Sequence, residues 1–414
     1  MSATLNLGNG DWATKENSLL GYNSENDNYK PLPFNFERDS KATVVNKDGL
    51  IETVGSGQPR IDYKDDSKGA LLLEPSRSNS ITHSNDFSQS GWDNVAYPVT
   101  ITSNSIISPD GSLNANLITP TSGSSRHAIR NLSVSATSGA TYTLSAFVKK
   151  GGSRYVVFGD AGDSLWRVVT ADLNNGVITN EYNSSGTITA YKNGWYRITC
   201  VITRTNSGTI QFSLGASETS SNSGLPSFNN TSLSVYAYGC QIEANSSYAT
   251  SYIPTQGSSV TRLAESCNNG ANEQVINSTE GVLYAEISAL DESQSVTTLT
   301  ISDGSLSNRV LIGLVSGEIR GQFVSSGNDI SRDSSGLIIE NFNKIACYYK
   351  SNIFKVFVNG FQVGSTATAT SALSGITELS FDRGDGALDF YGNVKDVRVY
   401  NTALTDAELK ALTT

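Results

Sequence analysis

The chain is poor in several residue types, and each scarcity excludes a class of protein or site. Among 414 residues there are four cysteines, two histidines, one methionine and nine prolines, and only 16% of residues are charged. No apolar run approaches the roughly 20 residues needed to cross a bilayer, so no membrane span is expected. Lysine and arginine form no cluster and the net charge is −10, which argues against a nucleic-acid partner, because phosphate backbones bind cationic surfaces.

The few cysteines and histidines lack the spacing of a metal site or a disulfide framework. His83 and His127 lie far apart, without a carboxylate partner, so no zinc site is expected. The cysteines show no paired CxxC spacing, and we expect buried thiols. They are Cys200, Cys240, Cys267 and Cys347.

Glycine, serine, threonine and asparagine are abundant and separate short apolar runs. There are 37 glycines, and turn-forming clusters follow segments such as 141–148, where apolar and polar residues alternate as in a strand. Asn359-Gly360 is a two-residue hairpin signal. Thr405 and Glu408 have capping-box spacing at the start of one short C-terminal helix. The sequence therefore predicts an all-β protein with antiparallel β-sandwiches and a single short helix.

The alternating pattern divides the chain into two sandwiches with flanking segments. Residues 1–68 show no sustained period, so we expect an extended N-terminal arm used for attachment or oligomerisation. Residues 69–254 predict a jelly-roll sandwich, residues 255–278 a linker, and residues 279–414 a second sandwich. A length of 414 residues is consistent with two domains of ordinary size.

The stretch from Leu233 to Glu265 marks the boundary between the two sandwiches. It begins with strand-like alternation and then meets Pro254, which cannot continue a ladder. We expect its strand to close the first sandwich, and we expect Tyr252 and Ile253 to be packed rather than free.

Three long segments lie in order along residues 34–265: RDSKATVVNKDGLIETVGSGQPRIDY, ALLLEPSRSNSITHSNDFSQSGW and CQIEANSSYATSYIPTQGSSVTRLAE. They resemble the block shared by a family of tailed-bacteriophage virion proteins described as tail or head fibre components, whose central unit is similar to jelly-roll carbohydrate-binding modules. The later segments FKVFVNGFQVG and LDFYGNVKDVRVYNTALTDAELKAL resemble the concanavalin-A-like, laminin-G-type sandwich.

The resemblance implies a virion structural protein whose sandwiches project from a phage particle and adhere to host-surface glycans. Such fibres are usually homotrimers, and we expect the N-terminal arm to hold other virion proteins. The first residues, MSATLNLGNGDW, lack the features of a secretory signal, so we expect synthesis in the bacterial cytoplasm and a final location on the particle surface. A glycan depolymerase and a purely structural capsid decoration protein are the alternatives.

Catalytic motifs are incomplete, and we expect no enzyme activity. Residues 162–165 spell GDSL, the tetrapeptide of a serine-esterase family, but both histidines precede Ser164, so a turn is the preferred interpretation. A glycosidase needs two carboxylates about 5 to 9 Å apart, and the Glu-x-Asp-x-Glu run of laminarinase-like relatives is absent. Glu286 and Glu292 fall on a polar strand face and in a turn, where solvated positions are expected.

The acidic loop FDRGDGALDF holds Asp382, Asp385 and Asp389. Gly384 and Gly386 lie between these acids and favour a turn. Calcium binding is the alternative, because hard cations take oxygen ligands from such loops. We expect no other cofactor.

Sugar binding is the favoured activity. Rings of tryptophan and tyrosine stack on the apolar faces of pyranoses, while polar side chains fix the hydroxyls at shallow loop sites. The candidates in the first sandwich are Trp166, Tyr155, Tyr191 and Arg167, with Asp160 and Asp163 as polar neighbours. The competing interpretation for each aromatic residue is packing within the sandwich.

Overall fold

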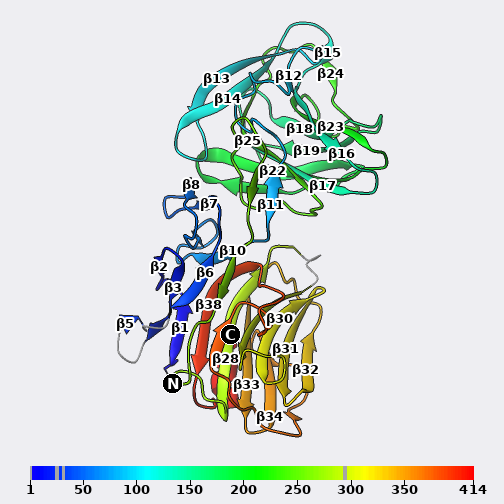
Figure 1. Cartoon of the computed structure of the whole chain (residues 1–414). Helices are drawn as coiled ribbons and strands as arrows, with labels where there is room; N and C mark the ends of the chain where they lie inside the picture. Colours follow the sequence, from blue (N-terminus) through cyan, green and yellow to red (C-terminus); the bar gives the residue numbers. More distant parts are fainter. Residues whose placement is uncertain (1, 24–27, 30–32, 292–295) are drawn as a thin grey trace. The chain divides into compact units, whose positions relative to one another are not determined.

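The structure, a computed structural model, describes residues 2–23, 28–29, 33–291 and 296–414 (Figure 1). Antiparallel strands dominate, and α1 (Asp406–Thr413) is the single α-helix among these residues. The all-β prediction is confirmed. Within the described ranges no helix is long and apolar enough to cross a membrane.

The chain divides into two compact units. Unit 1 comprises Met1–Lys47, Val54–Pro75 and Leu263–Thr414, and unit 2 comprises Asp48–Thr53 and Ser76–Arg262. Each unit has its own hydrophobic core.

Unit 2 is a sandwich of two six-stranded antiparallel sheets. The β18 sheet has the order β12 (Trp92–Asp93), β16 (Ile129–Ala136), β23 (Gly208–Ser217), β18 (Tyr155–Asp160), β19 (Arg167–Asp172), β20 (Val177–Tyr182). The β17 sheet has the order β13 (Val99–Ile107), β14 (Leu113–Pro120), β25 (Val235–Ala244), β17 (Thr141–Lys150), β22 (Trp195–Thr203), β21 (Ile188–Tyr191). Two short pairs complete the unit: β11 (Arg77–Asn79) with β26 (Val260–Arg262), and β15 (Ser125–Arg126) with β24 (Ser227–Phe228).

The predicted alternation builds the core of unit 2. Leu144, Ala146 and Val148 of β17 and Val156 and Phe158 of β18 belong to the same buried cluster, because alternate side chains of a strand point to the same face. A turn at 192–194 (η1, Lys192–Gly194) leads into β22.

The boundary stretch behaves as predicted in its packing. Its strand, β25, belongs to the first sandwich but pairs with both β14 and β17, inside the sheet rather than at an edge. Tyr252 and Ile253 are each 3% exposed, which confirms that they are packed. The amide of Ile253 donates to Gln241 Oε1 at 2.7 Å, and its carbonyl accepts from Asn79 Nδ2 at 2.9 Å.

Unit 1 contains an 11-stranded, a five-stranded and a four-stranded sheet. The first has the order β35 (Phe361–Gln362), β34 (Ile353–Val358), β33 (Asn343–Lys350), β28 (Glu280–Ala289), β38 (Gly392–Tyr400), β1 (Leu5–Gly8), β4 (Tyr22–Asn23), β5 (Asn28–Tyr29), with β9 (Ile61–Asp62), β10 (Ala70–Leu73) and β36 (Ala367–Thr368) attached beside it. The second has the order β32 (Asn328–Ser334), β31 (Glu318–Ser325), β30 (Arg309–Val315), β29 (Val296–Ser302), β37 (Glu378–Ser380). The third has the order β2 (Ala13–Lys15), β3 (Ser18–Leu20), β6 (Phe34–Glu37), β27 (Ser266–Asn268). The remaining strands are β7 (Ala42–Val45), which belongs to unit 1, and β8 (Ile51–Val54), of which residues 51–53 belong to unit 2.

The C-terminal helix begins as the sequence predicts. Thr405 accepts a hydrogen bond from the amide of Glu408, and the Glu408 carboxylate accepts from the amide of Thr405, which completes the capping box. Leu404 and Leu409 pack with Tyr348 and Phe357 of unit 1.

The N-terminal segment differs from the expected extended arm over residues 1–68. β1 pairs with β38 along its whole length (Figure 1), and Leu5 and Leu7 are 1% and 0% exposed. Phe34 and Phe36 of β6 are fully buried in the same core. The strands here have two to four residues, too few to show a period. Two of them nevertheless pair with strands that are distant in sequence, β1 with β38 and β6 with β27.

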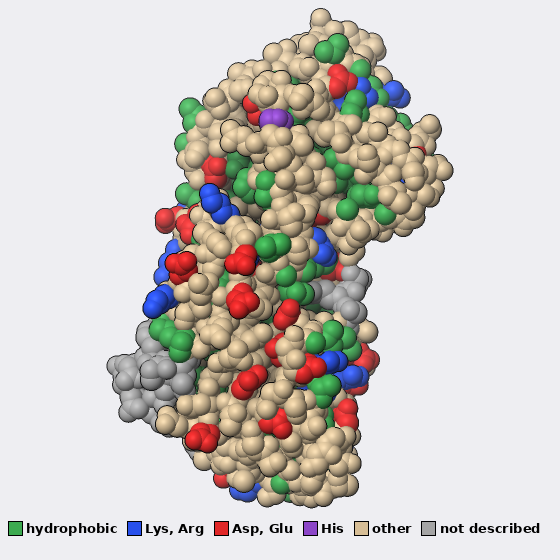
Figure 2. Space-filling model, in the orientation of Figure 1, with side chains coloured by type: hydrophobic (Ala, Val, Ile, Leu, Met, Phe, Trp, Pro, Cys, Tyr) green, Lys and Arg blue, Asp and Glu red, His purple; other side chains and the backbone are tan. Residues whose placement is uncertain are grey.

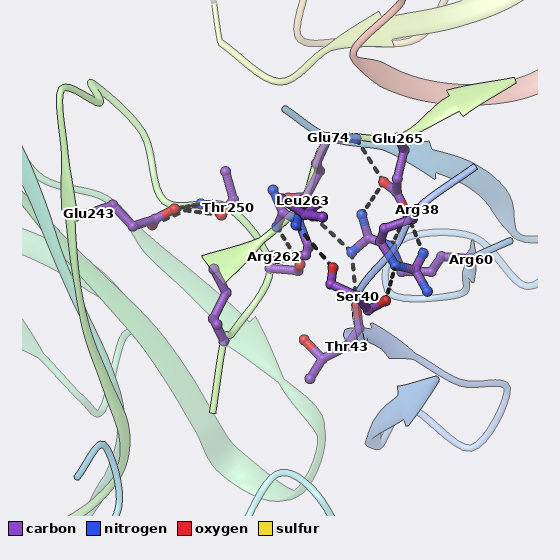
Figure 3. Close-up of polar contacts among 12 residues, drawn as sticks. Arg38, Ser40, Thr43, Arg60, Glu74, Glu243, Thr250, Arg262, Leu263 and Glu265 are labelled. Atoms are coloured by element: carbon purple, nitrogen blue, oxygen red, sulfur yellow. Dashed lines mark hydrogen bonds and ion pairs between the residues drawn. The ribbon is translucent and has the colours of Figure 1, made fainter. Parts of the chain in front are cut away.

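A buried ionic cluster joins distant segments of unit 1 around the carboxylate of Glu265 (Figure 3). Arg38 Nη1 donates to Glu265 Oε1 at 2.6 Å and Arg60 Nε donates to the same oxygen at 2.8 Å. Arg60 also contacts Glu265 Oε2, and its Nη1 lies 2.8 Å from Glu74 Oε2. The amide of Glu74 donates to Glu265 Oε2 at 2.9 Å. All four side chains are at most 3% exposed.

The two carboxylates of this cluster favour the charged form of Arg60. Burial alone would lower the pKa of Arg60, but the carboxylates of Glu265 and Glu74 outweigh that effect and raise it. Arg38 and Arg60 come from the segment RDSKATVVNKDGLIETVGSGQPRIDY, Glu74 from ALLLEPSRSNSITHSNDFSQSGW and Glu265 from CQIEANSSYATSYIPTQGSSVTRLAE. The three segments thus meet at a single buried ionic centre.

We predict that Glu265→Gln lowers the free energy of unfolding of unit 1 by about 3–5 kcal/mol, because two buried guanidinium groups lose their common anion. Urea unfolding of the full chain measures the change. Asp333→Asn is the matched control, since it breaks the Arg320–Asp333 pair, whose side chains are 34% and 33% exposed, and should cost less than about 1 kcal/mol. Equal effects of the two substitutions would contradict the assigned role of Glu265.

Candidate functional site

The residues predicted to contact a sugar lie in three separate places in unit 2. Four of them surround the turn that joins β18 to β19: Asp160, Asp163, Trp166 and Arg167. The other two are tyrosines, one at the far end of β18 and one on the β17 sheet. The structure therefore does not gather the predicted residues into one site.

The two tyrosines have local partners of their own. Tyr155 and Asp160 are the two ends of the six-residue strand β18, about 17 Å apart at the usual strand rise. The guanidinium carbon of Arg154 lies 4.9 Å from the ring centroid of Tyr155. Tyr191 packs edge-on against Phe147 with ring centroids 5.0 Å apart.

The charged members of the predicted set are buried together with Arg204, which directly follows β22. Arg167 donates to both carboxylate oxygens of Asp163, at 2.6 and 3.0 Å. Arg204 Nη1 donates to Asp160 Oδ2 at 2.9 Å, and its Nε lies 3.6 Å from Asp163 Oδ2. The four side chains are at most 3% exposed. Their burial argues against direct contact with a sugar and corrects our expectation that they line a shallow surface.

The two aspartates of this buried tetrad have opposite pKa shifts. The hydrogen bond from Arg167 outweighs burial and lowers the pKa of Asp163 well below its usual range. Burial dominates at Asp160 and raises its pKa, although the amides of Gln211 and Gly162 donate to it. The tetrad links the β18 sheet to the end of β22 in the β17 sheet, so its role is structural.

The outer surface of the β18 sheet carries a small second apolar cluster. Side chains alternate along strands, so residues of β18 and β19 that avoid the main core meet on this surface. The cluster consists of Ala128, Val157, Val168 and Leu225. Tyr97 and Trp166 pack against it and remain half-buried. A partly exposed aromatic surface therefore lies above a rigid sheet.

Two arginines lie over these rings and complete a group that we name the aromatic–arginine face: Tyr97, Arg126, Arg130, Trp166 and Tyr182. The guanidinium carbon of Arg126 lies 5.8 Å from the ring centroid of Tyr97 and 5.4 Å from that of Trp166. The guanidinium carbon of Arg130 lies 4.2 Å from the ring centroid of Tyr97. Contacts of this kind contribute about 0.5–1 kcal/mol at exposed sites, which helps to hold the arginines in place.

Trp166 and Tyr182 differ in how much of each ring is free. The backbone of Gly224 lies against the indole, because a Cβ at Gly224 would be 2.8 Å from Trp166 Cγ. Trp166 is therefore partly a packing residue. Tyr182 stands opposite Val168 in the β19–β20 register and so projects from the same surface, with 39% of the residue exposed.

Arg130 is anchored by an acid and an amide. It pairs with Asp93, and its Nη1 donates to Gln211 Oε1 at 3.2 Å. Burial would raise the pKa of Asp93, but hydrogen bonds from the Val95 amide and Arg130 outweigh it and lower the pKa. The carboxylate is thus charged and neutralises Arg130.

Sequence reasoning found Trp166 but missed the other members of this face. Tyr97, Arg126 and Arg130 lie in or beside segments far from Trp166 in sequence, and their contacts depend on strand order, which no local pattern reports. Tyr182 gave no usable signal, because strict alternation would place it on the same face as Ile178, which packs against the core, and a register shift between Thr170 and Ala171 turns it to the other face.

The residues considered for catalysis from the sequence have structural roles. Ser164 has a left-handed backbone with φ of +67° in the turn after β18, which confirms the turn interpretation of GDSL. The ring nitrogens of His127 lie 2.7 Å from the Pro98 carbonyl and 3.1 Å from the Phe228 carbonyl. Glu286 lies 3.6 Å from Lys395 Nζ, and Glu292 lies outside the described residues.

The acidic loop of unit 1 is a turn whose carboxylates have separate partners. Asp382 accepts from the Gly384 amide at 2.5 Å, Asp385 pairs with Arg383 at 2.6 Å, and Asp389 lies 3.3 Å from Tyr391 Oη. Where the chain is described, no three His, Cys, Asp or Glu side chains are grouped to hold a metal ion.

All four cysteines are free and buried, as predicted. On the face drawn in Figure 2, lysine and arginine side chains form no continuous stripe.

The tetrad generates a pH prediction. The folded pKa of Asp163 lies below its ordinary value of 3.8, so its contribution to stability is complete above that value and is lost as the pH falls through the folded pKa. Asp163→Asn should lower the stability of unit 2 at pH 7 and weaken its loss on acidification below about pH 4. Urea midpoints measured from pH 7 to pH 2 report both effects. The exposed Glu218→Gln is the control, and an unchanged acid profile in Asp163→Asn would refute the assignment.

Comparison with known proteins identifies the fold of the C-terminal region. Residues 285–410 match the family model described as the concanavalin A-like lectin/glucanases superfamily. No curated protein matches the chain.

Solved structures give distant likenesses. The CBM40 module of the Ruminococcus gnavus IT-sialidase, bound to alpha2,3 sialyllactose, is 16% identical over 36% of this chain and 94% of the module, with a TM-score of 0.29. Mouse laminin alpha1 chain domains LG4-5 are 9% identical over 64% of this chain and 85% of the laminin chain, with a TM-score of 0.25. The Trypanosoma rangeli sialidase is 11% identical over 97% of this chain and 83% of the sialidase, with a TM-score of 0.29. These TM-scores are too low to carry an argument, whereas the family match shows that the chain contains a concanavalin-A-like, lectin-like β-sandwich.

Proposed function

We propose that this chain is a non-catalytic virion component of a tailed bacteriophage that adheres to glycans on the host surface through unit 2. The observation that carries the glycan-binding part is the aromatic–arginine face, which combines half-buried rings with fixed cations on one sheet surface. Sugar sites use this combination, because aromatic rings cover the apolar faces of pyranoses and charged side chains hold their hydroxyls.

The shape of the face suits a weak, shallow site. Tyr97 and Trp166 rest on a buried apolar cluster, so their positions are set before a ligand arrives and little ordering entropy is lost on binding. Tyr182 extends the aromatic surface toward the edge strand β20. Weak sites are sufficient for a particle that presents many copies, because linked sites raise the effective concentration.

The virion part of the proposal rests on the sequence resemblance. The three segments that carry the resemblance pack together in unit 1, since each supplies at least one charged residue of the Glu265 cluster. The proposal includes a homotrimer. Light scattering on the full chain tests it, because a deletion of residues 1–68 would also remove the buried strands β1 and β6.

We predict that Tyr97→Ala and Tyr182→Ala each weaken glycan binding by about fivefold or more, through lost stacking. A glycan array followed by titration of the full chain measures the effect. Tyr155→Ala is the matched control, because this tyrosine belongs to the same sheet but lies at the opposite end of β18. The exposed Tyr182 keeps the test informative if Tyr97→Ala disturbs folding.

Two outcomes would refute this proposal. Binding that survives both substitutions but is lost in Tyr155→Ala would move the site to the other end of the sheet. Release of shortened oligosaccharides from the bound glycan would show a depolymerase instead of an adhesin.

A further inference from the structure

Arg126 stands apart from the other arginines of the β18 sheet surface because its charge is not neutralised. It is exposed, and its Nε donates to the carbonyl of Leu225 at 3.3 Å. Among the described residues no carboxylate pairs with it, whereas Arg130 pairs with Asp93 and Arg154 pairs with Asp172. The two terminal nitrogens of Arg126 donate to no described residue, so both remain free for a ligand.

The guanidinium of Arg126 is nevertheless held in place. Its carbon lies within 6 Å of two ring centroids, at 5.8 Å from Tyr97 and 5.4 Å from Trp166, and the bond to Leu225 fixes Nε. Residues 125 and 126 also form the short strand β15, which pairs with β24. A fixed guanidinium loses less rotamer entropy on binding than a mobile surface side chain.

Two free terminal nitrogens on a planar guanidinium match the two oxygens of a carboxylate. We infer that the aromatic–arginine face binds a carboxylate-bearing sugar, with the acid group on Arg126 and the sugar ring against the neighbouring aromatic surface. This inference rests on the proposed glycan-binding function and names the chemical class of the ligand.

The surrounding charge favours one acid group over a polyanion. The chain has a net charge of −10, and the charged carboxylate of Asp93 lies beside Arg130 on the same surface. A densely sulfated or phosphorylated chain would meet repulsion from these groups, whereas one carboxylate per binding unit is matched by the guanidinium of Arg126.

The test uses the full chain and matched pairs of glycans. Oligosaccharides containing glucuronic or galacturonic acid are compared with their methyl esters, which keep the sugar ring but remove the charge, and with neutral oligosaccharides. We expect the acids to bind about tenfold more tightly than the esters, as a charge-assisted hydrogen-bonded pair contributes. We also expect this preference to decrease as sodium chloride is added.

Substitutions test whether Arg126 is the residue that causes the preference for the acid over its ester. Arg126→Gln should abolish the preference for the acid, so that this variant binds the acid and its methyl ester equally. Arg126→Lys should keep part of it, because the charge remains but the planar fork is lost. Arg154→Gln is the matched control, since it removes the same charge from an arginine that lies beside an aromatic ring at the other end of β18. Equal urea midpoints show that the variants fold.

The outcomes separate this inference from the function on which it rests. Equal binding of acids, esters and neutral sugars overturns the carboxylate inference and leaves glycan binding intact. A preference that survives Arg126→Gln, or that falls equally in Arg154→Gln, also overturns it. If no glycan of any class binds, the proposed function and the inference fail together.

Discussion

Burying the carboxylate of Glu265 takes a negative charge out of water, and this costs several kcal/mol unless partners surround it. In unit 1 those partners are two guanidinium groups and one backbone amide. They belong to Arg38, Arg60 and Glu74, which are far apart in sequence, so several segments must reach the same point before the charge is satisfied. The N-terminal segment is thereby committed to unit 1 by charge as well as by the pairing of β1 with β38.

Unit 2 uses the same physical device at the turn between β18 and β19. Asp160 and Arg167 oppose each other in the register of these strands, and Arg204 reaches them from the end of β22. Because the tetrad fixes the turn, it also fixes the start of β19 and with it the neighbouring Trp166. Asp160, Asp163 and Arg167, which the sequence suggested as sugar contacts, are thus buried below the surface. They position the ring of Trp166, which lies on that surface.

The sequence predicts what depends on local pattern. Alternation located β17, β22 and β25, the Asn359-Gly360 turn lies between β34 and β35, and the capping box of α1 formed as expected. The N-terminal strands escaped prediction because strands of two to four residues carry no measurable period. The face containing Tyr97, Arg126 and Trp166 escaped for another reason: which residues become neighbours across a sheet depends on strand order, and strand order is not a local property.

The arginines of this protein divide by what they face. Arg38, Arg60, Arg167 and Arg204 are buried and lie against carboxylates, as they must be, because an unpaired buried charge would destabilise the fold. Arg126 is under no such requirement, since water solvates an exposed guanidinium. Its stacking on two rings therefore cannot be explained by a need to neutralise a buried charge. It leaves a fixed cation and an aromatic surface facing solvent, the two features that recognition of an acidic sugar requires.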